Sequence, residues 1–293
     1  MDVMAEHARR LPELDERWVP RSFARDELAR ALLDGRVAGV ATHPLDNVRG
    51  NIGMLLEGDP DKRFGLTGLS HGFRFDDVLA IVADAAGSPI DADQRFGEVH
   101  IAPEPILDAC AALGGRLAAA AERGERVVIS TGHPGALDVL YRELEGLAVG
   151  HGATVVRPAD GERWRDPDRD HDWTIGYLSG VGMISDGRAP RHTHRPDAME
   201  RMLARERPDL VLADHGFAGA AIEAGVETVS VADVNDPALL VARAQGRTEV
   251  VVVMDDHVPP EAYWPCFQAA AAAFPQVSDL GPTEGYRNDR PFP

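Results

Sequence analysis

Cysteine is scarce in this sequence, with only Cys110 and Cys266 among 293 residues. Two isolated cysteines cannot form a disulfide framework or a zinc site of the CxxC type. Long apolar runs are also missing, because charge or glycine interrupts each run before the roughly 18 residues that a membrane span requires. The N-terminal stretch MDVMAEHARRLPELDERWVP contains no apolar core of a signal peptide. These absences predict a cytoplasmic protein without a membrane segment, in which both cysteines pack as ordinary residues.

Positive charge is the third deficit, since 30 Lys and Arg face 48 Asp and Glu and give a formal net charge of −18. Such a surface repels a phosphate backbone, which excludes nucleic acid as the expected partner. A small anionic substrate stays compatible, because a divalent cation or a helix N-terminus can reverse the local potential. The hydrophobic fraction of 44% and the charged fraction of 27% are those of an ordinary globular protein.

From residue 126 onward, short apolar runs alternate with helical patterns. The predicted strands are 126–131, 153–157, part of 173–184, 209–213, 226–232 and 248–254. The predicted helices are 134–148, 196–206, 216–224, 236–245 and 260–273. Uniformly apolar strands separated by helices indicate a parallel sheet covered on both faces. We therefore predict an α/β fold in which residues 126–293 form a doubly wound, mostly parallel, Rossmann-like sheet, with a surface loop at 158–172.

The first 125 residues have a different pattern. One strand is predicted at 36–42, and helices are predicted at 46–58, 75–87 and 103–124. This pattern favours an N-terminal, mostly helical cap or subdomain that joins the sheet near residue 125.

Polar side chains follow several of the predicted strands. Because parallel strands end at a common edge, where ligands bind, these side chains are expected to converge. Carboxylate and carbonyl oxygens are the ligands that Mg²⁺ and Mn²⁺ prefer. Asp236 is interpreted as the N-cap of a helix opened by Pro237. The candidate metal ligands are Asp214, Asp233, Asn235 and Asp255, and Asp256 and the histidines 133, 215 and 257 belong to the same edge.

The segment VVISTGHPGAL (127–137) is a predicted strand and turn, followed by a helix that Pro134 could open. A helix opened by proline presents free N–H groups that favour a phosphate or carboxylate. The alternative is a tight turn that needs glycine only for its backbone geometry. On the first interpretation, Thr131, Gly132, His133 and Gly135 bind the substrate phosphate.

Two further segments supply candidate phosphate-binding residues. His192 and His194 project to one face of an extended segment and could bind a metal, orient a phosphate or transfer protons, although so short a pattern also arises by chance. Asn47 and Asn51 share a face of the helix at 46–58, and Arg49 could clamp a phosphate. The alternative for this helix is a solvated start capped by Asp46.

These segments together resemble a bacterial, largely actinobacterial, family of proteins assigned as phosphatases. The resemblance extends from about residue 36 to 265 and includes VAGVATHPLDNVRGNIGMLLEGDPDKRFGL, STGHPGALDVLYREL, HTHRPDAM, LADHGFAGAAIEAG, ADVNDPALLVA and VVVMDDHVPPEAY. The sequence is also, more faintly, similar to the metal-dependent damage-control phosphatases, which hold their metal with an Asp-Asn pair and a further Asp. Here His215 stands where that Asn would be expected.

Other phosphatase motifs are missing from the sequence. The segment ADVND lacks the Thr or Val of the DxDx(T/V) motif in haloacid dehalogenases. Neither cysteine lies in a CxxxxxR loop, and no GxxxxGK(S/T) loop occurs.

The leading hypothesis is a metal-dependent phosphatase that hydrolyses a small phosphorylated metabolite. Asp214 acts through the metal, and His215 or His257 serves as the general acid or base. Mg²⁺ or Mn²⁺ is the expected cofactor, with Co²⁺ or Ni²⁺ as alternatives. The other hypotheses are a non-catalytic binding protein for a phosphorylated or carboxylated metabolite, and a sugar-phosphate lyase or isomerase. A homodimer is expected only because it is the commonest symmetric assembly.

Overall fold

The computed structural model describes residues 3–166 and 171–275. Its helices are α1 (Val3–Ala8), α2 (Arg25–Asp34), α3 (Leu45–Glu57), α4 (Pro60–Arg63), α5 (Phe75–Ala86), α6 (Pro103–Glu122), α7 (Asp138–Gly150), α8 (Asp197–Arg205), α9 (His215–Glu223), α10 (Ala238–Ala244) and α11 (Trp264–Ala271). Two 3₁₀ turns lie at Glu16–Trp18 and Pro260–Tyr263. The strands are β1 (Gly39–Val40), β2 (His100–Ile101), β3 (Arg126–Ser130), β4 (Thr154–Val155), β5 (Arg163–Arg165), β6 (Asp172–Leu178), β7 (Val181–Ser185), β8 (Leu210–Asp214), β9 (Thr228–Ala232) and β10 (Val250–Val253).

An eight-stranded sheet forms the centre of the molecule, in the order β10-β9-β8-β3-β7-β6-β5, with β4 also paired to β3. Strands β10, β9, β8, β3 and β7 run parallel to one another. Strand β6 pairs antiparallel with both β7 and β5. Strands β3, β8 and β9 are almost entirely buried because helices cover both faces of the sheet. The predicted α/β fold with a mostly parallel sheet is confirmed.

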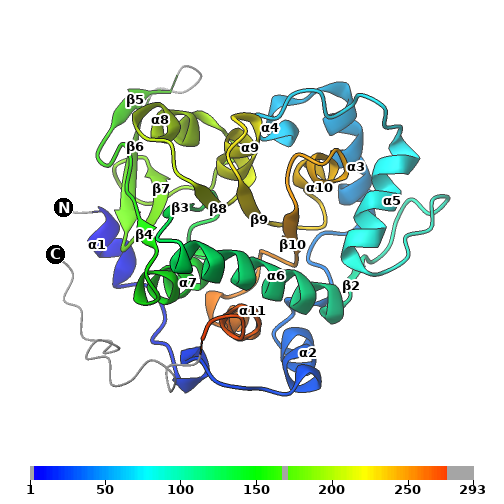
Figure 1. Ribbon diagram of the computed structural model, residues 1–293. Coiled ribbons are helices and arrows are strands. Elements are labelled where there is room, and N and C mark those ends of the chain that lie inside the picture. Colours follow the sequence, from blue (N-terminus) through cyan, green and yellow to red (C-terminus); the bar gives the residue numbers. More distant parts are fainter. Residues whose placement is uncertain (1–2, 167–170, 276–293) are drawn as a thin grey trace.

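The helices form a layer on each face of this sheet (Figure 1). Helices α6 and α7 lie against one face, and α11 packs on the outside of them. Helices α9 and α10 lie against β8, β9 and β10 on the other face, and α8 packs on α9. The sheet is therefore enclosed, and its strand ends are the places where polar groups can meet.

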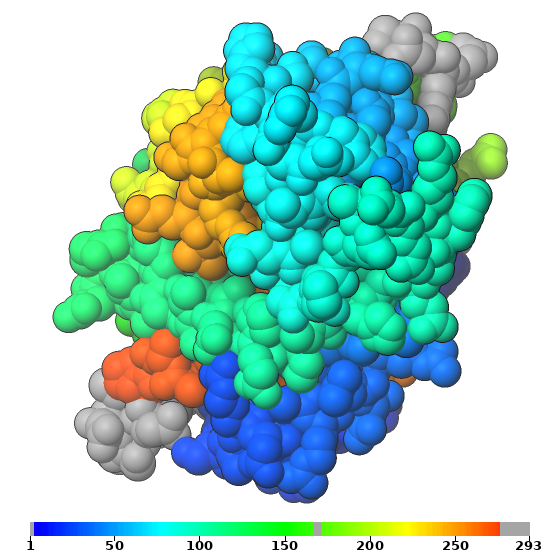
Figure 2. Space-filling view, turned by 90° about the vertical axis from the view of Figure 1, so that its right-hand side faces the viewer, coloured from blue at the N-terminus to red at the C-terminus, as the bar shows by residue number. Residues whose placement is uncertain are grey.

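The N-terminal segment packs beside the sheet as well as over it. Helix α5 lies against α3 and α10, and in Figure 2 the cyan surface around α5 adjoins the orange surface of α10. Strands β1 and β2 form a separate antiparallel pair, shorter than the strand predicted at 36–42. Helix α6 covers β9 and β10. The division near residue 125 stays a prediction.

Two predictions about local structure were wrong. Residues 163–165 of the predicted surface loop form β5, which extends the sheet as an antiparallel edge strand. Helix α7 begins at Asp138 instead of 134, because the backbone amides of Ala136 and Leu137 both bond to the carbonyl of His133 in a tight turn. Pro134 therefore does not open the helix.

Candidate active site

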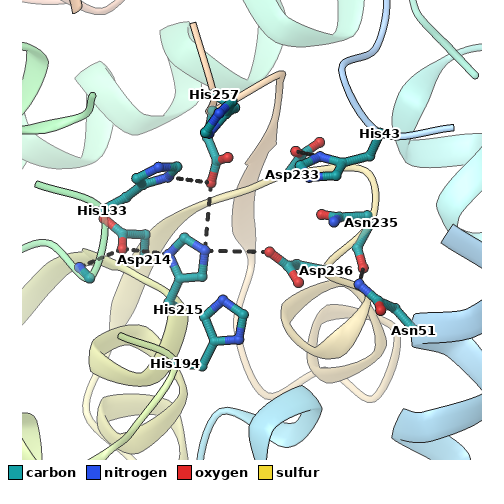
Figure 3. A network of polar contacts seen from close by, with 12 residues as sticks. His43, Asn51, His133, His194, Asp214, His215, Asp233, Asn235, Asp236 and His257 are labelled. Carbon is teal, nitrogen blue, oxygen red and sulfur yellow. Dashed lines mark hydrogen bonds and ion pairs between the residues drawn. The ribbon is translucent and has the colours of Figure 1, made fainter. Parts of the chain in front are cut away.

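The ends of four neighbouring strands and two loops bring histidines and carboxylates together (Figure 3). Strand β8 ends at Asp214, and His215 begins α9 with a left-handed φ of 45°. Such a conformation is uncommon for histidine, and the surrounding contacts must hold it in place. The other contributors are His133 after β3, Asp233, Asn235 and Asp236 after β9, Asp255, Asp256 and His257 after β10, His43 after β1, and His192 and His194 between β7 and α8.

His215 lies at the centre of the cluster and is only 3% exposed. Its Nδ1 is 2.8 Å from Asp214 Oδ1, and its Nε2 is 3.4 Å from Asp236 Oδ2 and 3.6 Å from Asp256 Oδ2. Burial alone would lower the pKa of His215, but the hydrogen bonds to Asp214 and Asp236 raise it well above its ordinary value. Three carboxylates thus favour a positive charge at this imidazole.

Asp214 lies behind His215 and is fully buried. The same Oδ1 that accepts the bond from His215 also accepts the backbone amide of Gly132 at 2.7 Å. Burial and the nearby Asp214 carboxylate raise the pKa of Tyr141 well above its usual range. Asp214 is therefore placed to orient His215 and to fix the turn after β3.

His194 repeats this arrangement beside His215. The two rings stack with centroids 5.0 Å apart and planes 9° apart. The Nδ1 of His194 is 3.0 Å from Asp61 Oδ2. In the same way, the Nδ1 of His215 contacts a carboxylate oxygen of Asp214. Burial, together with the charge of His215, lowers the pKa of His194. Both imidazoles thus have Nδ1 held by a carboxylate and direct Nε2 elsewhere.

Glycine at position 216 allows the close approach of these two histidines. A Cβ at Gly216 would lie 2.3 Å from the carbonyl oxygen of His194 and 2.2 Å from that of Arg195. Phe64 contacts both imidazoles edge-on, with ring centroids 5.1 Å from His194 and 5.4 Å from His215. The HG sequence that begins α9 is therefore required by packing around the site.

A second stacked pair consists of His133 and His192, with centroids 4.6 Å apart and planes 7° apart. The Nδ1 of His133 is 3.3 Å from Asp256 Oδ2. Burial, with the neighbouring imidazoles contributing, lowers the pKa of His192 to about 3, so its ring is neutral at pH 7.

Several buried polar atoms in the cluster have no hydrogen-bond partner among the described residues. They are Asp214 Oδ2, Asp236 Oδ1, Asp256 Oδ2, Asn235 Oδ1 and His133 Nδ1. A buried acceptor that lacks a donor costs about 1–3 kcal/mol, and more when it is charged. Two groups have ligand atoms within 4.8 Å of one another and could hold a metal ion: His133, His192 and His215, and His194, His215 and Asp236. Their imidazole nitrogens and carboxylate oxygens suit such an ion.

Two of the predicted metal ligands have partners on both carboxylate oxygens. Asp255 accepts the amide and hydroxyl of Thr42, each at 2.6 Å, and the amide of His257 at 3.0 Å. Asp233 accepts the amide of Val234 and lies 2.7 Å from His43 Nδ1. Burial raises the pKa of Asp233 to about 7 although His43 opposes the rise. The structure thus places these two acids in contacts that fix the strand-end loops.

The turn after β3 does not present the free amides that the sequence suggested. The amides of Gly132, His133 and Gly135 bond to Asp214, Thr131 Oγ1 and Asp138 respectively. Because Pro134 has no N–H, the turn from 132 to 135 keeps its donors inside the protein.

The three residues of α3 that the sequence analysis named do not all join the cluster. Asn47 Oδ1 accepts a bond from the side chain of Asn235 at 2.9 Å, and Asn51 bonds to the Asn235 carbonyl at 2.8 Å. Arg49 instead bonds to the carbonyl of Ala92 and lies over the Phe75 ring, so it does not join the cluster.

Three carboxylates of the cluster were not selected as site residues from the sequence. Asp236 makes no cap bond to α10, and its side chain is directed to His215, so the prediction of a helix cap was wrong. Asp256 was predicted to lie at the same sheet edge, but only its neighbour Asp255 in the segment MDDH was selected as a metal ligand. Asp61 lies in α4, far from any predicted strand end, and the sequence carries no signal for its contact with His194.

Comparisons with known proteins identify the family of this chain. Residues 23–270 match the family model described as Phosphatase. The chain is 35% identical over 258 residues to Phosphatase SCO2771 from Streptomyces coelicolor, a match that covers 84% of this chain and 94% of that protein. The matched region contains every residue of the cluster. This chain therefore belongs to the Phosphatase family and is a hydrolase.

Proposed function

We propose that this phosphatase is metal-dependent and hydrolyses a small phosphomonoester. One observation supports the proposal most strongly: buried oxygens of Asp236 and Asp256 have no hydrogen-bond donor, and both carboxylates face Nε2 of His215. A cation between them would offset the cost of burying these charges.

The proposed ligands are His194, His215 and Asp236, whose ligand atoms lie within 4.8 Å of one another. Two imidazoles and one carboxylate are the ligand types of catalytic zinc sites and of several iron, manganese and cobalt sites. Magnesium is disfavoured because it prefers oxygen ligands. The ion is therefore proposed to be a transition metal such as Zn²⁺, Mn²⁺, Fe²⁺ or Co²⁺.

Asp214 and Asp61 are proposed to orient these ligands. A carboxylate on Nδ1 keeps the proton there and leaves Nε2 free to bind a metal. The ion would supply Lewis acidity toward the phosphoryl oxygens and activate water as the nucleophile.

The substrate is proposed to be small because the cavity beside the histidines is limited in size. It measures about 640 Å³ and is lined by His192, His194, Asp61, Pro60 and Trp173, among other residues. This volume is in the range of pockets that hold small molecules.

A search of the described helices for a membrane span found none with the required length and apolar character.

His43 is the proposed proton donor to the leaving group. Its side chain is 31% exposed, and Asp233 holds its Nδ1 at 2.7 Å, which leaves Nε2 available to the substrate. As water bonds to phosphorus and the ester P–O bond breaks, the proton moves from Nε2 to the departing oxygen, the attacking water releases a proton to solvent, and Nε2 is protonated again from solvent. His215 is too enclosed for this role, whereas His192 and His257 are exposed imidazoles of the cluster, and the lowered pKa of His192 leaves that ring neutral at pH 7.

The first experiment measures turnover with each metal. Purified protein treated with chelator is supplied with Mg²⁺, Mn²⁺, Fe²⁺, Co²⁺, Ni²⁺ or Zn²⁺ and assayed against p-nitrophenyl, sugar, nucleotide and coenzyme phosphates. Free phosphate is detected by phosphorus NMR. We expect activity with at least one transition metal, its loss in His215→Ala, and normal activity in His100→Ala, an exposed control. Full activity in the chelated protein would exclude the metal dependence.

The role of His43 is tested separately with His43→Gln. Phosphate esters with poor leaving groups need the proton most, so we expect a large loss of kcat for alkyl phosphates and little loss for p-nitrophenyl phosphate. An equal loss for both substrates would assign His43 a different role.

A further inference from the structure

The chain contains one lysine, Lys62, among 30 basic residues. It lies in α4, and its side chain is only 15% exposed. Lysine is rarely so enclosed without partners, because its ammonium group is strongly hydrated. The position of this single ammonium group therefore calls for an explanation.

Lys62 is connected to the proposed metal ligands through Asp61. The distance from Lys62 Nζ to Asp61 Oδ2 is 3.1 Å, and the same oxygen is 3.0 Å from Nδ1 of His194. Directly after Lys62 and Arg63, Phe64 packs on the rings of His194 and His215. A Cβ at Gly219 of α9 would lie 1.9 Å from the Phe64 carbonyl oxygen, so the backbone of this segment is close to α9. Helix α4 is thus fixed beside the site.

The charge of Lys62 acts on the cluster itself. Burial would raise the pKa of Asp236. The hydrogen bond and the charge of His215, with a contribution from Lys62, outweigh burial and lower this pKa below its ordinary value. Burial and His215 lower the pKa of His194, and Lys62 again contributes in the same direction. The geometry agrees, because one oxygen of Asp61 is 3.1 Å from Nζ of Lys62 and 3.0 Å from Nδ1 of His194, which places the ammonium group close to His194.

A phosphate dianion that approaches this site meets a strongly acidic environment. Asp214, Asp233, Asp236, Asp255 and Asp256 all lie at the strand ends and are buried. Among residues 3–166 and 171–275, Asp61 is the carboxylate within ion-pair distance of Lys62. One carboxylate oxygen does not use all three N–H donors of the ammonium group. A cation at the edge of the cluster would offset the repulsion of an anionic substrate.

We propose that Lys62 binds the phosphate group of the substrate at the edge of the metal site. The inference rests on the proposed function of the same site. Lysine suits this task as a point charge with several donors, and Asp61 holds it beside His194.

Kinetics of Lys62→Met and Lys62→Arg test the proposal. We expect Lys62→Met to raise both KM and the inhibition constant of inorganic phosphate about 10- to 100-fold, the range for a hydrogen bond to a charged group. Lys62→Arg should recover part of both values. Arg30→Gln removes one positive charge from the exposed side of α2 and should leave both unchanged. Thermal melting and elemental analysis confirm that each variant is folded and retains its metal.

Chemical labelling gives a test that does not depend on a variant. Because Lys62 is the only lysine, reductive methylation can modify one side-chain amine, which mass spectrometry separates from the N-terminus. We expect inorganic phosphate to slow the methylation of Lys62, and an equal concentration of chloride to have no effect.

The outcomes separate this inference from the function on which it rests. An active enzyme with an unchanged phosphate inhibition constant in Lys62→Met, and no protection by phosphate, would overturn the role of Lys62 alone. No turnover by the wild-type protein with any metal would instead overturn the proposed function.

Discussion

At the scale of single residues, the site is built from repeated pairs of a histidine and a carboxylate. Asp214 holds Nδ1 of His215, and Asp61 holds Nδ1 of His194. Asp214 and His215 are adjacent in sequence, whereas Asp61 and His194 are 133 positions apart. In each pair the carboxylate fixes one nitrogen, so the other is available for chemistry.

Asp214→Asn tests the importance of this orientation. The change keeps the shape of the side chain but removes the charge that fixes the His215 tautomer, so we expect metal affinity to fall about 10- to 100-fold. Titration against a competing chelator measures the effect. Asp26→Asn, at an exposed position of α2, is the matched control. Equal metal affinity in the two variants would contradict the proposed orientation.

Gly216→Ala tests the close packing of α9 against the loop that carries His194. The new Cβ would lie 2.3 Å from the His194 carbonyl oxygen, and the loop must shift to accept it. We expect activity to drop at least tenfold, because a shift of about 1 Å can cost about 100-fold. Gly53→Ala in α3 meets nothing within 4 Å and should instead raise stability by about 0.5–1 kcal/mol. Normal activity of Gly216→Ala would show that the spacing is not required.

At the scale of elements, uniformly apolar strands could be predicted from the sequence, and amphipathic edge strands could not. The runs that became β3, β8, β9 and β10 are mostly valine, leucine, isoleucine and alanine, and their ends placed Asp214 and His215 correctly at the edge of the sheet. Strand β5 has the sequence RWR and was taken for a loop. A short, charged edge strand is defined by its pairing with β6, which the sequence alone does not encode locally.

The same limit applies to the site. Side chains at strand ends were predictable because a parallel sheet aligns those ends. The contacts from His43 to Asp233 and from Asp61 to His194 span 190 and 133 residues. They depend on how the N-terminal segment packs over the sheet edge, and no local pattern reports that packing.

Helix α1 supports the turn after β3 from outside the sheet. His7 Nε2 is 2.5 Å from Oδ2 of Asp138, a fully buried carboxylate that also accepts the amide of Gly135. We expect His7→Ala to lower the free energy of unfolding by about 1–3 kcal/mol, because it leaves Asp138 with fewer donors. Urea denaturation measures the change, with His100→Ala as the exposed control. Equal stability of the two variants would mean that the pair contributes little.

At the scale of the whole molecule, an acidic chain concentrates buried carboxylates at one edge of its sheet. The formal net charge is −18, and the cluster adds local repulsion between acids that are shielded from water. A bound cation would therefore contribute to the stability of the whole fold as well as to the reaction.

Removal of the metal should lower the thermal stability. At a free metal concentration 100 times the dissociation constant, binding adds about 2.7 kcal/mol, which corresponds to a Tm decrease of roughly 5–10 °C after chelation. Differential scanning calorimetry with and without chelator measures the shift. We expect the Asp236→Asn variant to show a much smaller shift. A chelator that leaves the wild-type Tm unchanged would argue against a structural contribution.

The most direct test of the metal centre is anomalous X-ray diffraction from crystals of the active protein, recorded on both sides of the absorption edge of the metal found by elemental analysis. We predict an anomalous peak about 2.0–2.2 Å from the imidazole nitrogens of His194 and His215 and from an oxygen of Asp236. An active crystal without a peak at these three residues would contradict the proposed centre.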